Sequence, residues 1–203
     1  MFEDTYKTII AISEGLYKEK GSRFIALAFP VNNEQEVKEA LGGLRKTYHD
    51  ARHHCYAYVI GFDRATSRMN DDGEPSGTAG KPIYNQILAS GLTNVLVVVV
   101  RYFGGTLLGV SGLLRAYKTA AADALSKAKI IEKTVNDVYG LAFPYIHMND
   151  VMRCLKENNA IFLEQNYDTE SFIRFSVRKG FSDKIFEILR KIEGAKITYE
   201  KTI

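Results

Sequence analysis

The stretch VLVVVVRYFGGTLLGVSGLLRAYKTAAADAL, residues 95–125, decides the fold of the first two thirds of the chain. Its run of valines is typical of a strand that is buried in a sheet. Four glycines follow between residues 104 and 112. The alanine-rich segment after them predicts a helix over residues 111–128, with Ser111 as its N-cap. The stretch therefore predicts a buried strand, residues 94–103, that turns through a glycine loop into a helix.

Further elements are predicted upstream of this stretch. Alternation over residues 5–12 and an apolar run over residues 22–31 predict two strands, and residues 53–62 predict a third. A helix is predicted over residues 34–48, capped by Asn32 or Asn33, with acids in its first turn. The segment 63–82 is polar and longer than loops that merely join two elements, so we expect it to be functional or mobile. A helix over residues 83–90, ended by Gly91, leads back to the buried strand.

After residue 133 the pattern restarts in a simpler order. Strands are predicted over residues 135–143, 161–167, 171–177 and 195–202, and helices over residues 149–159 and 182–192. The order βαββαβ is that of a ferredoxin-like sandwich. We therefore expect an α+β protein with two domains, residues 1–133 and residues 134–203.

Composition and charge narrow the functional class. The 203 residues are 46% hydrophobic, as expected for a folded protein with a core. The sequence has no apolar run of bilayer length and no signal-peptide pattern, so we expect a soluble, cytoplasmic protein with no membrane contact. Cys55 and Cys154 are expected to be reduced. Residues 1–133 carry 17 Lys and Arg against 14 Asp and Glu, and the remainder 10 against 10, so an anionic partner should contact the first domain.

The glycine loop resembles a phosphate cradle only in part. Gly104 and Gly109 have the spacing of a P-loop, but Val110 stands where the P-loop lysine is required, and the dinucleotide pattern GxGxxG is absent. What remains is a ring of backbone amides before a helix, flanked by Arg101 and Arg115, which could bind an anion along residues 104–112. The alternative is a backbone corner whose glycines permit positive φ.

Two other segments carry polar groups. Asp71, Asp72 and Glu74 could hold a divalent metal, but the calcium-loop spacing is not met, and the segment could equally specify turns. We therefore expect no metal and no cofactor. His49 and His53 would suit zinc only if both were helical, and we expect Cys55 to pack in the core. His54 or His53 beside Asp50 could act as a general base.

Three long segments carry a resemblance to a known family. DARHHCYAYVIG (residues 50–61), NDDGEPSGTAGKPI (residues 70–83) and GLTNVLVVVVRYFGGTLLGVSGLLRAY (residues 91–117) closely resemble the YigZ/IMPACT family. The resemblance implies a ribosomal-protein-S5 domain-2-like α/β fold for the first domain. It implies a ferredoxin-like tail similar to an elongation factor G domain. Eukaryotic members are translational regulators, but they carry a further domain that has no counterpart in this sequence.

No catalytic residues are established for the family, so the motif positions form the presumed site. The candidate catalytic residues are His54, Asp71 and Asp72. The candidate ligand-binding residues are Arg52, His53, His54, Arg68, Asp72, Glu74, Ser76, Gly77, Thr78, Gly80, Lys81, Arg101, Gly104, Gly105, Thr106, Gly109, Ser111, Gly112 and Arg115. We expect the three segments to fold into a single concave patch.

Three functions are compatible with these residues. We favour a non-enzymatic, translation-associated protein that contacts RNA, the ribosome or a ribosome-associated protein through its arginines and lysines, with Tyr84, Tyr102 and Phe103 available to stack on bases. The second is a hydrolase of a phosphorylated or nucleotide substrate, with His54 as its base and a metal on Asp71 or Asp72. The third is a protein-binding adaptor that uses Leu107, Leu108 and Val110. A dinuclear peptidase is not supported, because the acids and histidines cluster in separate segments.

Overall fold

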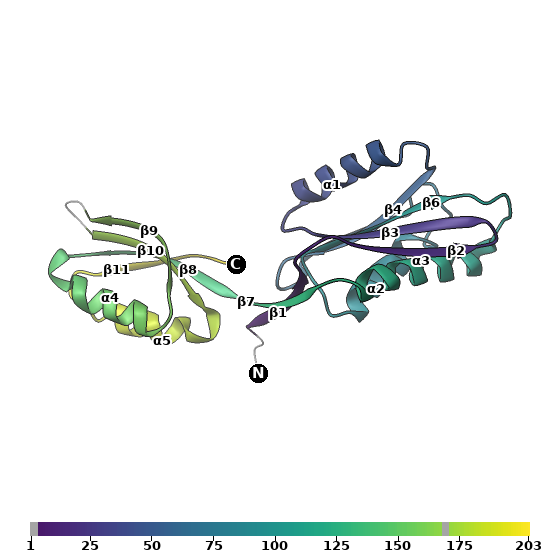
Figure 1. The fold of residues 1–203 in the computed structure, drawn as a ribbon. Coiled ribbons are helices and arrows are strands. Elements are labelled where there is room, and N and C mark those ends of the chain that lie inside the picture. The colour runs from purple at the N-terminus through teal and green to yellow at the C-terminus, as the bar shows by residue number, and fades with distance from the viewer. Residues whose placement is uncertain (1–3, 168–170) are drawn as a thin grey trace. The chain divides into compact units, whose positions relative to one another are not determined.

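A computed structural model describes residues 4–167 and 171–203. The chain divides into two compact units, a larger one of Lys7–Lys133 and a smaller one of Thr134–Ile203 with the residues up to Tyr6. The larger unit has a five-stranded antiparallel sheet in the order β2-β3-β6-β4-β5 and three helices (Figure 1). Its elements are β2 (Ser13–Glu19), β3 (Ser22–Pro30), α1 (Glu34–Thr47), β4 (His53–Ile60), β5 (Thr66–Asn70), α2 (Gly80–Ala89), β6 (Val95–Tyr102) and α3 (Gly109–Ser126).

Helices cover both faces of this sheet, which explains the valine run. Helix α1 lies on one face, and α2 and α3 lie on the other (Figure 1). Val95, Val97 and Val99 of β6 belong to the core under α2 and α3, whereas Val98 and Val100 belong to the core under α1. Because successive side chains of a strand point to opposite faces, a central strand with two covered faces is apolar throughout.

The structure corrects several predicted boundaries in this unit. Strand β2 was not predicted, because its inward positions are the small residues Ser13 and Gly15. Strand β5 lies within the segment that was expected to be a loop; it is an exposed edge strand without apolar alternation. Helix α3 begins at Gly109, so the predicted capping role of Ser111 is wrong, and Leu108 at the N-cap provides no side-chain hydrogen bond. The cap at Asn33 is confirmed, since its Oδ1 accepts the Glu36 N–H at 3.0 Å.

The smaller unit has the predicted ferredoxin-like order. Its strands pair antiparallel in the order β11-β8-β10-β9, with α4 and α5 packed against the sheet through one apolar core. In chain order the elements are β8 (Asn136–Phe143), the 3-10 turn η1 (Tyr145–His147), α4 (Met148–Glu157), β9 (Ile161–Tyr167), β10 (Ser171–Arg178), α5 (Lys179–Leu189) and β11 (Lys196–Thr202). The protein therefore has the expected α+β class.

The first described residues belong with the smaller unit, although residues 1–133 were expected to form one domain. Asp4 accepts two hydrogen bonds of 2.7 Å from the Arg178 guanidinium, and its carbonyl oxygen accepts the Val135 N–H at 2.7 Å. Strand β1 (Thr5–Ile9) pairs with β7 (Ile130–Thr134), a strand that was not predicted. Among the helices of the described residues, none combines the length and the apolar character needed to span a bilayer.

Candidate functional site

The three family segments meet at a buried ion pair. The Arg101 Nη1 atom, at the end of β6, lies 2.6 Å from Glu74 Oε1 in the 71–79 loop, and the two side chains are 7% and 3% exposed. Tyr117 of α3 donates its hydroxyl hydrogen to the same Glu74 oxygen at 2.7 Å. Cys55, at the start of β4, completes this cluster of Cys55, Glu74, Arg101 and Tyr117, which we call the Glu74 network.

The thiol of Cys55 has no access to solvent. Its Sγ atom lies 3.0 Å from the Asp71 carbonyl oxygen and 3.3 Å from the Tyr117 hydroxyl, and the residue is fully buried in the core under α2 and α3. Burial raises the pKa of the Cys55 thiol far above its ordinary value. Because the thiolate is the reactive form of cysteine, Cys55 serves as a packing residue, as the sequence predicted.

Asp71 is committed to the backbone of its own loop. Its carboxylate accepts N–H groups from Gly77 at 2.8 Å, from Ala79 at 3.0 Å and from Gly80 at 2.8 Å. Burial acts to raise the pKa of Asp71, but these three hydrogen bonds outweigh it and lower the pKa below its ordinary value. Within residues 4–167 and 171–203, no three His, Cys, Asp or Glu side chains gather as they would around a metal ion.

His54 and Asp72 lie toward α1, away from the Glu74 network. The backbone N–H of His54 donates to Asp72 Oδ2 at 2.7 Å, and the His54 ring nitrogen Nδ1 lies 4.0 Å from the same oxygen. The His54 side chain is buried, and its burial lowers the pKa of the ring although the Asp72 charge opposes this. Asp50, which the sequence offered as a partner for a histidine base, accepts a 2.7 Å hydrogen bond from the Tyr102 hydroxyl.

Part of the glycine loop is a packing corner. The Gly104 N–H donates to Ser22 Oγ at 3.1 Å, and a Cβ at Gly104 would lie 2.0 Å from the Gly21 carbonyl carbon. Only glycine lets the loop cross the β2–β3 turn at this distance. Gly105 and Gly109 have positive φ with open space around them, and Leu107 is 82% exposed. The loop after Gly104 is therefore an exposed surface.

The candidate residues do not form one patch. Arg68 pairs in register with Tyr58, whose side chain packs under α1, so Arg68 and His54 lie on the α1 face. Arg101 and Arg115 lie on the opposite face. The exposed candidates are Arg52, Arg68, Ser76, Lys81, Gly104, Gly105, Thr106, Gly109, Ser111 and Arg115; the buried ones are His54, Glu74, Thr78, Gly80, Arg101 and Gly112; His53, Asp71, Asp72 and Gly77 are intermediate. The predicted single concave patch is thus divided by the sheet.

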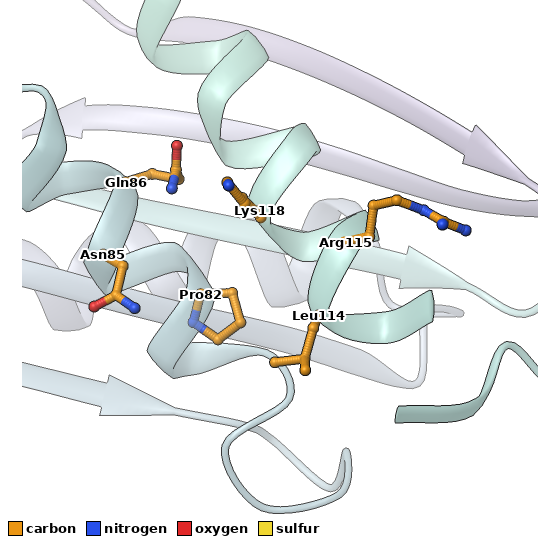
Figure 2. Close-up of a pocket in the computed structure, with 6 residues that line it drawn as sticks. All are labelled: Pro82, Asn85, Gln86, Leu114, Arg115 and Lys118. Carbon is orange, nitrogen blue, oxygen red and sulfur yellow. The ribbon is translucent and has the colours of Figure 1, made fainter. Parts of the chain in front are cut away.

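A pocket of about 410 Å³ opens between α2 and α3, and the sequence singled out only one of its residues, Arg115. Figure 2 shows the six side chains that line it, three from each helix: Pro82, Asn85 and Gln86 of α2, and Leu114, Arg115 and Lys118 of α3. On α2, Asn85 and Gln86 follow Pro82 by three and four positions, and on α3, Arg115 and Leu114 precede Lys118 by three and four positions, so each set lies on one helical face. Polar residues at this spacing on two predicted helices could have indicated the pocket from the sequence, but they belong to no short motif.

Known proteins resemble this chain along most of its length. Residues 20–125 match the Impact N-terminal domain. IMPACT family member YvyE of Bacillus subtilis is 31% identical, covering 98% of this chain and 95% of that protein. IMPACT family member YigZ of Escherichia coli is 34% identical, covering 84% and 87%. A solved structure described as that of a hypothetical protein has a TM-score of 0.76 at 28% identity, covering 98% of this chain and 99% of that one.

Proposed function

The chain belongs to the IMPACT family, and we propose that it is a non-enzymatic, cytoplasmic protein of translation that contacts RNA through the α2 and α3 face of its larger unit. The exposed cations Lys81, Arg115 and Lys118 all belong to these two helices. Phosphate groups of RNA attract such cations, and the attraction depends on salt.

The distribution of charge is the observation that carries this proposal. The two candidate acids on this side of the sheet bond to partners inside the protein: Asp71 to backbone amides and Glu74 to Arg101. The candidate cation Lys81 instead has an exposed side chain. Because the carboxylates bond to groups inside the protein, the exposed charge of α2 and α3 near the 71–79 loop is positive. A surface of this sign favours an anionic partner.

The environment of the catalytic candidates also supports binding over turnover. A hydrolase would need a base and a metal-holding carboxylate that reach the same substrate. His54 is buried on the α1 face, and both oxygens of Asp71 already accept backbone hydrogen bonds. A binding role needs neither group to be released.

An adaptor that binds a protein is the second candidate, favoured by exposed apolar side chains. Leu107 and Val110 are 82% and 59% exposed at the start of α3. Exposed apolar groups of this size are typical of contact surfaces when they cluster. A partner captured equally well before and after nuclease treatment would favour this candidate over RNA.

Titration of the whole protein with a labelled single-stranded RNA tests the proposal. We expect affinity to fall as salt rises, and Lys81→Gln to weaken binding more than Lys38→Gln. Lys38 is an exposed lysine of α1, so it makes the same change of charge on the other face of the sheet. Absence of RNA binding at low salt, or equal loss in both variants, would overturn the proposed face.

A further inference from the structure

The pocket between α2 and α3 carries hydrogen-bonding groups that the fold does not use. The side-chain amides of Asn85 and Gln86 make no hydrogen bond to any other described residue, and neither does the Lys118 ammonium group. By contrast, the amides of Asn32, Asn33 and Gln35 near the start of α1 all bond to glutamates. The amides of the pocket are therefore available to a ligand.

The two sides of the pocket differ in chemistry. Pro82 and Leu114 are apolar, and Asn85 and Gln86 offer both donors and acceptors. Arg115 and Lys118 are its charged residues, and no acid lines it. Figure 2 shows Lys118 extending toward α2, whereas the Arg115 guanidinium points away from α2, where it pairs with Glu19. Lys118 is thus the cation that faces the pocket.

This combination matches the parts of one nucleotide. A base has two apolar faces and an edge of donors and acceptors, and its phosphate is an anion. The exposed Leu114 side chain suits the face of a base, the two amides suit its edge, and Lys118 suits the phosphate. The volume of about 410 Å³ lies within the range of small-ligand pockets. The backbone of a peptide also offers donors and acceptors to the amides, so an acidic peptide competitor is part of the experiment below.

We propose that the α2/α3 pocket holds one unpaired nucleotide of a single-stranded RNA, an inference that rests on the proposed function. The base must be unpaired, because the edge that the amides would contact is occupied by the opposite strand in a duplex. Asn85 and Gln86 then act as residues that discriminate between bases. Lys118 contributes affinity without discrimination, because every nucleotide carries the same phosphate.

The experiment measures the affinity of the full chain for short single-stranded homopolymers and for a duplex RNA. In wild type we expect one homopolymer to bind more tightly than the others, and the duplex to bind more weakly. The double variant Asn85→Ala/Gln86→Ala should lose roughly fivefold or more on the preferred homopolymer and should level the preference. Lys118→Gln should weaken all single strands by a similar factor.

The controls are two single variants of α1 on the other face: Gln35→Ala, which removes an amide, and Lys38→Gln, which removes a lysine. All five substituted positions have at least partly exposed side chains, and thermal melting checks that every variant is folded. If wild type binds RNA and the pocket variants bind it with the same affinity as the control variants, the proposed role of the pocket is overturned but the proposed function stands. Wild type that binds no RNA would overturn both. Two other results would overturn the assignment of the pocket to an unpaired nucleotide. One is an affinity for the duplex equal to that for single strands, and the other is displacement of RNA by an acidic peptide that is lost in Lys118→Gln.

Discussion

Arg101 and Arg115 lie on the same side of the five-stranded sheet but in opposite environments. Arg101 is 6% exposed and bonds to a buried carboxylate, whereas Arg115 has an exposed side chain that pairs with Glu19 at the surface. Both belong to the same family segment, and the sequence assigned both to ligand binding. A charged residue of a motif can therefore be part of the core, and its burial and its partners decide its role.

The largest effect is expected when the Glu74 network is broken. Glu74→Ala leaves the Arg101 guanidinium buried without its counter-charge, which should lower the free energy of unfolding by about 3–5 kcal/mol. Urea unfolding followed by circular dichroism measures this loss. Glu14→Ala, at an exposed position of β2, is the control and should change the same quantity by less than about 0.5 kcal/mol. Similar losses in both variants would contradict a core role for the network.

A smaller effect is expected from the loop that carries Glu74. Asp71→Ala removes the acceptor of three backbone N–H groups and should lower the free energy of unfolding by about 2–3 kcal/mol. Since the pKa of Asp71 is lowered in the folded protein, its contribution is present above the ordinary Asp value and is lost as pH falls through the folded pKa. The wild type should therefore lose stability in acid more steeply than Asp71→Ala in denaturant titrations. Parallel curves would show that the carboxylate is not holding the loop.

The α1 face should respond to pH in a separate range. The pKa of His54 is lowered by burial, so the unfolded chain binds a proton more readily than the folded one. The free energy of unfolding should fall as pH drops below about 6.5, the ordinary histidine pKa. Asp72 and Arg45 are the charged groups beside this ring: the Asp72 charge raises the pKa of His54 and so limits the change, whereas the Arg45 charge lowers that pKa further. His54→Gln should flatten the fall between about pH 7.5 and pH 5.5; an unchanged slope would assign it to another group.

The smallest effect on stability is expected at Arg115. Its side chain is 62% exposed, so the ion pair with Glu19 is screened by water. Arg115→Gln should leave the free energy of unfolding close to that of wild type. If thermal melting showed Arg115→Gln to be as unstable as Glu74→Ala, the assignment of Arg101 to the core and of Arg115 to the surface would be contradicted.

Much of the fold was predictable because its signals are local. The valine run predicted β6, and the spacing of short elements after residue 133 predicted the ferredoxin-like unit. The site was less predictable, because its roles depend on contacts between distant segments. Nothing near Glu74 in the sequence indicates that its partners are Arg101 and Tyr117. The pocket was missed for the same reason, since it exists only where α2 packs beside α3.

The account assigns buried charges to the core and exposed charges to RNA binding. The salt dependence of RNA affinity in Lys118→Gln tests this assignment most directly. If Lys118 contacts a phosphate, the slope of log affinity against log salt should become shallower by roughly 0.7, the value for one contact to a single strand. The free energy of unfolding should stay within about 0.5 kcal/mol of wild type, because the side chain is exposed. A slope equal to that of wild type, with RNA binding intact, would contradict the assignment of binding to the α2/α3 pocket.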